Sequence, residues 1–290
     1  MGLGGKRLRP MLTLLAYNLY RENAAEITRY AIAVEAFHNF TLMHDDIMDK
    51  APLRRGHQTV HEKWDVNTAI LSGDVMLVKV YELFHSLDAA VFKTVIKSFN
   101  KCAAEVCEGQ QWDMEFEQSD NVNEAQYIRM IRLKTAVLLG FSLELGGILA
   151  DAPAEDRRLL YEFGVNIGIG FQLKDDLLDA FADPKKFGKQ VGGDIIANKK
   201  TFLLIKALEV APPTTKRELK QWISASRFNR QKKVDAVKEI YQQLGIPSIT
   251  EKKINSYFRR GFRSLEKTSG NYQAKATLKD FAEALMARQS

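Results

Sequence analysis

Three aspartates stand together in the stretch TLMHDDIMDKAPLRRG, residues 41–56, and two arginines follow them. The carboxylates are those of Asp45, Asp46 and Asp49, and the arginines are Arg54 and Arg55. Crowded carboxylates repel one another and are costly to remove from water unless a cation lies between them. The cluster is therefore either a solvated helix face or a metal site, and this stretch alone leaves both interpretations open.

A second cluster with the same spacing favours the metal site. The stretch FQLKDDLLDAF contains Asp175, Asp176 and Asp179, about 130 residues after the first cluster and again between apolar residues. In a helix, residues four apart lie on one face, so each cluster would present its first and last carboxylates together. Two such faces opposed across a helical core would form a cage of hard oxygen atoms. Such oxygens suit Mg²⁺, which keeps several waters and shares its coordination with substrate phosphates.

Basic residues near both acidic clusters would suit a phosphorylated ligand. Arginine forks and lysine ammonium groups are the usual partners of phosphate oxygens. Any one of these side chains is more often a solvated charge, but together with two acidic clusters they describe a pocket for a diphosphate. The residues concerned are Lys6, Arg9, Arg54, Arg55, Lys134, Lys189 and Lys199, with Thr135 beside Lys134.

The elements that must position these side chains have a helical pattern. Apolar residues recur at spacings of three and four, as in Leu71, Val75 and Val78, and strand-like alternation is almost absent. The prolines fall where helices would begin or end, so we predict an all-α bundle of long helices. Residues 183–200, DPKKFGKQVGGDIIANKK, break the pattern and are predicted to form a long loop. Such a loop is either a surface connector or a functional segment.

The composition argues against several classes of protein. The net charge of +6 is no signature of nucleic-acid binding, and YFRRGFRS at residues 257–264 is too short and isolated to form such a surface. Cys102 and Cys107 give no disulfide framework, so a reducing, cytoplasmic location is the expectation. No apolar run reaches the roughly 18–20 residues of a membrane span, and no signal peptide is expected. The histidines offer no zinc spacing with a third ligand.

Six motifs occur along the chain in the order GGKRLRP, EAFHNFTLMHDDIMDKAPLRRG, GQQWDM, KTA, GIGFQLKDDLLD and FGKQVGGDIIANKKT. On these motifs, from residue 4 to about 205, the chain resembles the trans-isoprenyl diphosphate synthases. The resemblance implies the isoprenoid synthase type I fold, an all-α single bundle of long antiparallel helices around a deep central cavity. It also implies one polyprenyl synthase domain over residues 1–290 and a homodimer.

The resemblance assigns roles to the residues at matching positions. It implies Mg²⁺ bound with the allylic diphosphate, about three ions when substrate is present. The implied metal ligands are Asp45, Asp49 and Asp175, supported by Asp46, Asp176 and Asp179. The implied isopentenyl diphosphate pocket contains Lys6, Arg9, His38 and Arg55. The implied allylic and catalytic side contains Arg54, Lys134, Thr135, Gln172, Lys189 and Lys199.

The implied reaction is head-to-tail prenyl transfer. The allylic diphosphate ionises to a carbocation, isopentenyl diphosphate attacks it through its double bond, and a proton is lost. The protein must stabilise the departing pyrophosphate as its negative charge grows, and must keep water from the cation. Closure of residues 183–200 over the diphosphates is our hypothesis for excluding water.

Aromatic residues before the first acidic cluster are candidates for the floor of the product cavity. Phe40 lies five residues before Asp45, roughly 7.5 Å along a helix, and Phe37 and Thr41 lie near it. Ordinary core packing is the alternative, and the sequence leaves both open. In the family, an aromatic residue at this position goes with short products. We therefore expect geranylgeranyl diphosphate (C20), with farnesyl diphosphate (C15) next.

Two departures from the family pattern stand out. The family normally has a few dozen residues before GGKRLRP, so one or more N-terminal helices are expected to be missing from this sequence. Immediately before the lysine that corresponds to Lys199 the family usually has glycine, whereas this chain has Asn198. That difference puts the geometry of the segment and the role of Lys199 in question.

Two other functions share part of this pattern. A class I terpene cyclase also uses DDxxD and a helical cavity, but its second metal motif mixes Asn, Ser or Thr and Glu, whereas this chain repeats DDxxD. A non-catalytic subunit of a prenyl synthase usually lacks one acidic motif, and both are intact here. Condensation of isopentenyl diphosphate with an allylic diphosphate is therefore the preferred hypothesis.

Overall fold

Helices make up almost all of the regular structure. The computed structural model describes residues 4–119, 121–182 and 191–287. In this part of the chain the only strands are the two short strands of one hairpin, so the predicted all-α fold is confirmed.

The chain divides into two compact units. The first comprises Met1–Ala103, Leu138–Tyr161 and Glu266–Leu278, and the second comprises Ala104–Val137, Glu162–Leu265 and Lys279–Ser290. Several helices contribute residues to both units. The single domain expected over the whole chain stays a prediction.

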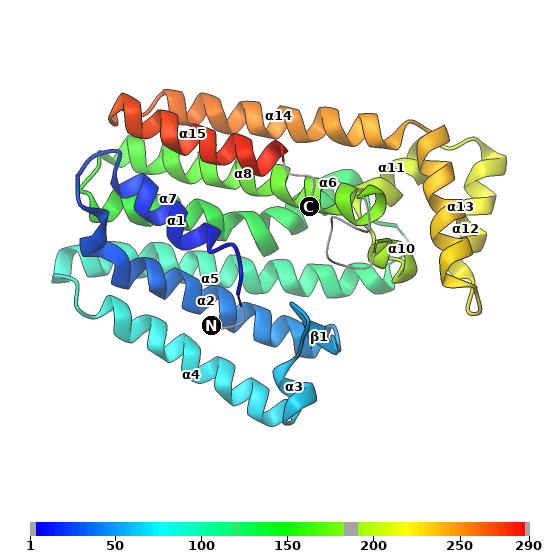
Figure 1. Ribbon diagram of the computed structural model, residues 1–290, viewed down its shortest axis with the longest axis horizontal. Coiled ribbons are helices and arrows are strands. Elements are labelled where there is room, and N and C mark those ends of the chain that lie inside the picture. Colours follow the sequence, from blue (N-terminus) through cyan, green and yellow to red (C-terminus); the bar gives the residue numbers. More distant parts are fainter. Residues whose placement is uncertain (1–3, 120, 183–190, 288–290) are drawn as a thin grey trace. The chain divides into compact units, whose positions relative to one another are not determined.

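The first unit is built on the N-terminal helices. Figure 1 shows α2 and α4 side by side, and the contacts between these two helices are extensive. Its elements are α1 (Leu8–Tyr17), η1 (Ala24–Ile27), α2 (Thr28–Met48), β1 (Leu53–Arg54), β2 (His57–Gln58), α3 (Val60–Lys63) and α4 (Val66–Phe84), with parts of α5 (Ala89–Gln118), α7 (Val137–Leu149), α8 (Ala154–Phe181) and α15 (Tyr272–Ala287).

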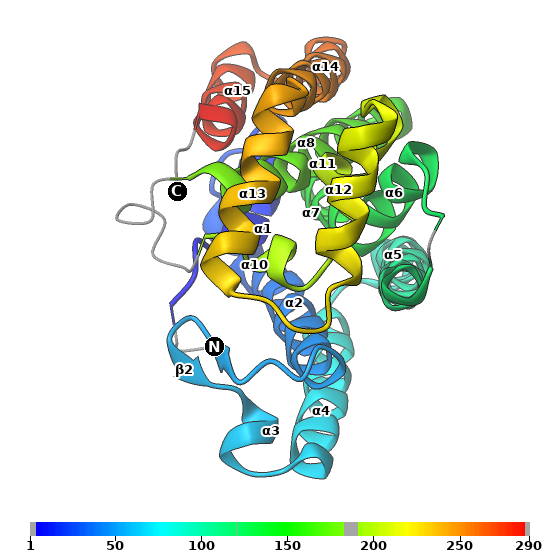
Figure 2. The ribbon, with the colours of Figure 1, turned by 90° about the vertical axis from the view of Figure 1, so that its right-hand side faces the viewer.

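The second unit contains the remaining parts of α5, α8 and α15 and the helices between them. Figure 2 shows α12 and α13 side by side, with the short α10 next to them. Its other elements are α6 (Glu124–Ile131), η2 (Arg132–Ala136), α10 (Gly193–Ile196), α11 (Phe202–Val210), α12 (Pro213–Ser224), α13 (Arg230–Gln243) and α14 (Ile246–Glu266).

Local sequence signals explain where several of these helices begin. The Asp65 carboxylate accepts a hydrogen bond from the Thr68 N–H at 2.9 Å and so caps α4. Asn123 and Gln126 form a reciprocal capping box at the start of α6. A proline occupies the first turn of α12, where its missing N–H costs nothing. The capping residues therefore begin helices in the regions where the spacing of apolar residues predicts them.

A short β-hairpin follows α2 and was not predicted. Leu53 pairs with Gln58 and Arg54 pairs with His57. The two turn residues, Arg55 and Gly56, have φ angles of 54° and 78°, as a two-residue hairpin turn requires. The hairpin carries both arginines of the first motif, Arg54 in β1 and Arg55 in the turn.

The predicted loop at residues 183–200 is only partly irregular. Residues 183–190 lie outside the described residues, but Gly193–Ile196 form α10, so the loop prediction was wrong for this part. The main reason is a tertiary contact: the Asp194 N–H donates to Asp179 Oδ2 at 2.9 Å, which anchors the first turn of α10. Among the helices given above, none has the sustained apolar stretch that a membrane crossing needs.

Candidate active site

The first acidic motif lies at the end of α2. Asp45 and Asp46 belong to the last turn of the helix, and Asp49 follows it as an exposed residue. Asp46 is 5% exposed and accepts a hydrogen bond from Arg54 Nε at 2.6 Å, while Arg54 Nη2 lies 3.2 Å from Asp45 Oδ2. Burial raises the pKa of Asp46, and the Arg54 charge opposes this shift. The hairpin thus places the Arg54 guanidinium in contact with the carboxylates of Asp45 and Asp46.

Several arginines of the first unit act on one histidine near this motif. The pKa of His38 is lowered to about 2, first by burial and then by the charges of four arginines, Arg9, Arg55, Arg54 and Arg7. Burial also lowers the pKa of Arg9, to about 10, so its guanidinium still stays protonated at neutral pH. Four arginines therefore act on one neutral imidazole. A group of side chains with this charge balance suits an anion such as a diphosphate.

Aromatic side chains pack on the α2 turns before the first motif. Phe37 is 1% exposed and contacts Phe40 and Phe99, with ring centroids 5.6 and 5.0 Å apart respectively. Phe40 is only partly buried and contacts His44, with ring centroids 4.7 Å apart. Thr41 donates its hydroxyl hydrogen to the His38 carbonyl at 2.8 Å. Phe37 is thus a core residue, whereas Phe40 retains accessible surface.

In the second unit, Lys134 and Thr135 lie on a turn of π-helix, η2. Turns of this kind are rare and occur mostly at functional sites. A Cβ on Gly109 of α5 would lie 2.2 Å from the Lys134 backbone nitrogen, so only glycine permits this close approach. Lys134 Nζ donates to Asp113 Oδ2 at 2.6 Å. The turn and its lysine are therefore held by two residues of α5.

A chain of hydrogen bonds connects η2 with the second acidic motif. The Thr135 hydroxyl donates to Gln172 Oε1 at 3.2 Å, and Gln172 Nε2 donates to Asp176 Oδ1 at 3.1 Å. The Tyr127 hydroxyl donates to the other Asp176 oxygen, Oδ2. Asp176 is buried, and each of its oxygens accepts one of these hydrogen bonds.

Carboxylates crowd together at the second motif. Burial and the charges of Asp179 and Asp176 raise the pKa of Asp194 to about 8. The pKa of Asp176 is raised to about 6, mainly by burial, although its hydrogen bonds oppose the shift. Such crowding favours a bound proton or a cation. Asp175, by contrast, is only partly buried.

One pocket of the second unit brings these groups together, and both positive and negative side chains line it. Its lining includes Asp113, Tyr127, Lys134, Thr135, Gln172, Asp176, Asp194 and Lys199. Within the described ranges, no group of three or more His, Cys, Asp or Glu side chains is arranged to hold a metal ion by itself.

The structure thus gathers the predicted residues into two sets. The first unit contains Lys6, Arg9, Phe37, His38, Phe40, Thr41, Asp45, Asp46, Asp49, Arg54 and Arg55. The second contains Lys134, Thr135, Gln172, Asp175, Asp176, Asp179 and Lys199. Lys189 lies outside the described residues. The roles of these residues stay predictions.

Sequence reasoning assigned no role to three further residues of the site. Asp113 pairs with Lys134, Tyr127 donates to Asp176, and the charge of Asp194 adds to that of Asp179. Asp113 and Asp194 do lie within the motifs GQQWDM and FGKQVGGDIIANKKT, so their positions carried a signal. Tyr127 lies outside every motif and carried none.

Comparison with known proteins agrees with the fold and the two motifs. The family model described as polyprenyl synthetase matches residues 1–244. The chain is 39% identical over 286 residues to a short chain isoprenyl diphosphate synthase of Methanocaldococcus jannaschii, covering 98% of this chain and 86% of the relative. It is 37% identical over 273 residues to a geranylgeranyl diphosphate synthase of Sulfolobus acidocaldarius, covering 92% of this chain and 81% of the relative.

A solved structure extends the likeness to the whole described fold. A crystal structure of a geranylgeranyl pyrophosphate synthase superposes with a TM-score of 0.95 and 46% sequence identity, covering 100% of this chain and 89% of that chain. The chain belongs to the polyprenyl synthetase family and has the all-α isoprenoid synthase fold. Within this family it is a short-chain trans-prenyltransferase.

Proposed function

We propose that the chain condenses isopentenyl diphosphate with an allylic diphosphate and that geranylgeranyl diphosphate is its main product, with farnesyl diphosphate the next candidate. One observation carries this proposal: each acidic motif has basic side chains beside it. Arg54 contacts Asp46 in the first unit, and Lys134 and Lys199 line one pocket with Asp176 in the second. Diphosphates bind through both kinds of group, directly to cations and through Mg²⁺ to carboxylates.

Isopentenyl diphosphate is assigned to the arginines around His38 in the first unit. The charges of Arg9 and Arg55 both act on His38, which supports assigning these two arginines to one diphosphate. A neutral imidazole can donate one hydrogen bond to a phosphate oxygen without repelling the arginines. Lys6, exposed in the segment before α1, is a further candidate for this diphosphate.

In the family resemblance, the first acidic motif binds the allylic diphosphate through Mg²⁺, and Arg54, Lys134 and Lys199 are assigned to the same substrate. The positive charges of Arg54, Lys134 and Lys199 would stabilise the pyrophosphate as the C–O bond breaks. Thr135 and Gln172 offer oxygen dipoles that can stabilise the carbocation. We assign removal of the final proton to the released pyrophosphate.

The proposal includes Mg²⁺, about three ions when both substrates are bound. Asp45, Asp49 and Asp175 would be the ligands, and a metal that shares its coordination with phosphates needs only one or two carboxylates for each ion. The crowding that raises the pKa of Asp194 is the kind of site that a divalent cation stabilises. When bound, the ions would offset the negative charge of the leaving group. Asp176 is assigned to orientation, because both its oxygens already accept hydrogen bonds.

Product length is assigned to the aromatic residues of α2. Burying the apolar surface of each added five-carbon unit contributes on the order of 4 kcal/mol of favourable free energy where the cavity has space. A bulky side chain that removes this space would therefore stop elongation. Phe40 retains exposed surface and is the candidate floor, with Thr41 beside it. Phe37 supports it from the core side. The name of the Sulfolobus relative supports the C20 product.

The direct test uses purified protein, labelled isopentenyl diphosphate, Mg²⁺ and C5, C10 or C15 allylic diphosphates. We expect the label to enter a C20 product, identified by chromatography after removal of the diphosphate. A terpene cyclase would instead convert the allylic diphosphate without consuming label. A non-catalytic subunit would leave all three primers unchanged.

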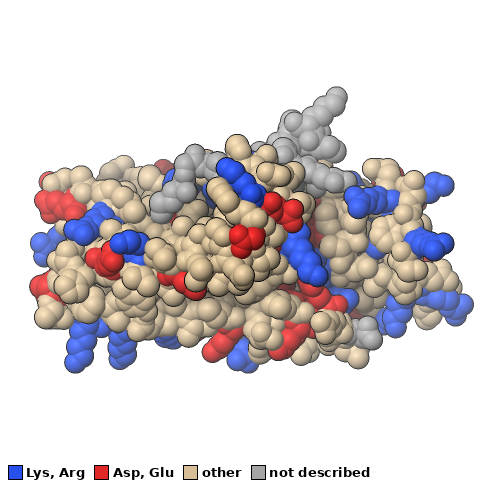
Figure 3. Space-filling view, turned by 90° about the horizontal axis from the view of Figure 1, so that it is seen from below, with Lys and Arg blue, Asp and Glu red and all other residues tan. Residues whose placement is uncertain are grey.

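We also propose that the protein is a homodimer that associates through α4. Leu71, Val75 and Val78 are 64%, 57% and 56% exposed on one helix, and an apolar surface of this kind is typical of an interface. Figure 3 shows mostly uncharged atoms on the face from which α4 is seen. A two-fold symmetric contact would cover this surface with its own copy.

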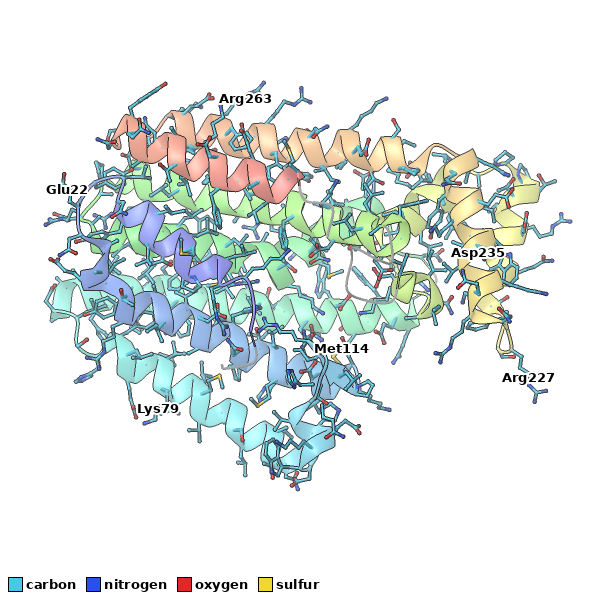
Figure 4. The ribbon with its side chains drawn as sticks, in the orientation of Figure 1. Glu22, Lys79, Met114, Arg227, Asp235 and Arg263 are labelled. Carbon is cyan, nitrogen blue, oxygen red and sulfur yellow. The ribbon has the colours of Figure 1, made fainter. Side chains whose placement is uncertain are left out.

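Light scattering tests the dimer. The double substitution Leu71→Glu with Val75→Glu should halve the measured mass, whereas Arg227→Glu, which reverses an exposed charge outside α4 (Figure 4), should not. An unchanged mass in the double variant would contradict association through α4.

A cytoplasmic location remains part of the proposal, since both cysteines are free thiols.

A further inference from the structure

A buried lysine on α13 has no part in the reaction proposed above. Lys233 is 1% exposed. Among the described residues no carboxylate forms an ion pair with it. Asp235, two residues further along α13, is exposed and lies on a different face of the helix (Figure 4). A buried ammonium group is costly unless its hydrogen bonds are satisfied, so its partners indicate what it does.

The hydrogen-bond partner of Lys233 is the side chain of Asn198. Lys233 Nζ donates to Asn198 Oδ1 at 2.6 Å and lies 4.2 Å from the ring centroid of Phe228, a cation–π distance. Asn198 has a φ of 55°, in the left-handed region that glycine adopts freely and asparagine tolerates. The family usually has glycine at this position. Position 198 therefore has the left-handed backbone conformation that glycine would adopt, and the Asn198 side chain is bound by Lys233.

The conformation of Asn198 determines where the next residue, Lys199, points. The Lys199 N–H donates to the Asp194 carbonyl at 3.0 Å, and the Thr201 N–H donates to the Lys199 carbonyl at 2.9 Å. The backbone around Lys199 is therefore part of a tight turn whose direction depends on the left-handed residue. The Lys199 side chain lines the same pocket as Lys134.

A second contact seats this segment on α13. A Cβ on Gly192, whose φ is 86°, would lie 2.7 Å from Val234 Cγ1, so the backbone before α10 packs directly on the residue after Lys233. On the other side, the Asp194 N–H donates to Asp179 of the second acidic motif. Figure 2 shows α10 close to α13. Residues 192–199 are thus held between the acidic motif and two consecutive residues of α13.

We propose that Lys233 is a positioning residue: it holds Asn198 in the left-handed conformation and so places Lys199 for the allylic diphosphate. The proposal rests on the proposed function and adds a residue that does not touch substrate. Asparagine and lysine together do what glycine does alone in the family. A variant with glycine at position 198 therefore no longer needs the lysine.

The test is a double-mutant cycle of Lys233→Met and Asn198→Gly, with steady-state kinetics for each substrate. Lys233→Met should raise the KM for the allylic diphosphate about tenfold, the size expected for a lost hydrogen bond to a charged group. The KM for isopentenyl diphosphate should stay within about twofold. Asn198→Gly should change either KM little. In the Asn198→Gly background, Lys233→Met should no longer raise the KM for the allylic diphosphate.

The matched control is Lys232→Met, which changes an exposed lysine of the same helix and should leave both KM values unchanged. An unchanged KM for the allylic diphosphate in an active Lys233→Met protein would overturn the proposal. The proposal would also be overturned if Lys233→Met raised this KM as much in the Asn198→Gly background as in the unsubstituted protein. Where Lys233→Met does not fold, Asn198→Ala decides. Alanine offers no side-chain hydrogen-bond acceptor and adopts a positive φ less readily than asparagine. The KM of this variant for the allylic diphosphate must therefore rise. Absence of turnover in the unsubstituted protein would instead contradict the proposed function.

Discussion

Gln172 donates a hydrogen bond from Nε2 to Asp176 Oδ1, 3.1 Å away and one turn further along α8. Because the hydroxyl of Tyr127 donates to the other carboxylate oxygen, Asp176 is held from two directions. The Gln172 Oε1 is then left to accept from Thr135. This chain of contacts determines which way the amide faces. Asp176 and Gln172 are therefore held in one orientation by hydrogen bonds with residues of α6 and η2.

We predict that Tyr127→Phe impairs catalysis more than it impairs folding. The substitution removes one hydrogen bond to a buried carboxylate, worth about 1.5–3 kcal/mol, so kcat/KM should fall about 10- to 100-fold. The Mg²⁺ concentration for half-maximal activity should rise, because Asp176 loses its orientation. Tyr272→Phe, which changes a side chain that is 83% exposed, is the control. An Mg²⁺ titration identical to that of the unsubstituted protein would contradict this role.

Two phenylalanines of α2 are predicted to have different effects. Phe40→Ala should lengthen the product, because its partly buried ring is the candidate floor, and chromatography of the products measures this directly. Phe37→Ala should mainly destabilise the fold, by about 3–5 kcal/mol, because its ring is fully buried against Phe99. A product distribution unchanged by Phe40→Ala would refute the floor assignment.

The helices and the two acidic motifs could be predicted from the sequence because their signals are local. Apolar spacing indicates a helix within a few turns, and the spacing of Asp175 and Asp179 places them on one face. The sequence also showed asparagine at position 198 where the family usually has glycine, but not what this difference does to the backbone. The structure places Asn198 in the left-handed region, which preserves the backbone expected of glycine.

Contacts between distant residues account for what the sequence did not reveal. Tyr127 and Asp176 are 49 positions apart, and Lys233 and Asn198 are 35 positions apart, so no local pattern links them. The π-helical turn depends on the close approach of Gly109 from another helix. Such features follow from packing, which single-sequence patterns do not encode.

His38 is predicted to make the stability of the fold depend on pH. Its pKa is about 2 in the folded protein, against an ordinary value of 6.5, so between these values the unfolded chain binds a proton that the folded chain does not. The contribution of the neutral imidazole is therefore complete above pH 6.5 and is lost as the pH falls from there toward 2. The expected slope is about 1.4 kcal/mol for each pH unit below 6.5. Urea unfolding at several pH values measures it.

The control for this prediction is a second histidine of the first unit. His38→Gln should flatten the pH dependence of the free energy of unfolding between pH 5 and 6.5. His57→Gln changes an exposed histidine and should leave the slope as it is. Equal slopes in both variants and in the unsubstituted protein would show that His38 is not held neutral by burial and by its arginine neighbours.

The proposed metal ligands give the sharpest prediction. Asp45→Asn and Asp175→Asn should each lower kcat/KM by at least about 100-fold, since each replaces a charged ligand of Mg²⁺ with a neutral amide. Chelation of Mg²⁺ should abolish turnover, and added Mg²⁺ should restore it. Asp280→Asn, which changes an exposed aspartate of α15, should have no effect. Because amides keep the shape of the carboxylates, thermal unfolding should change little, so that any loss of rate reports on the charge. Full turnover by both variants would contradict the assignment of the two acidic motifs.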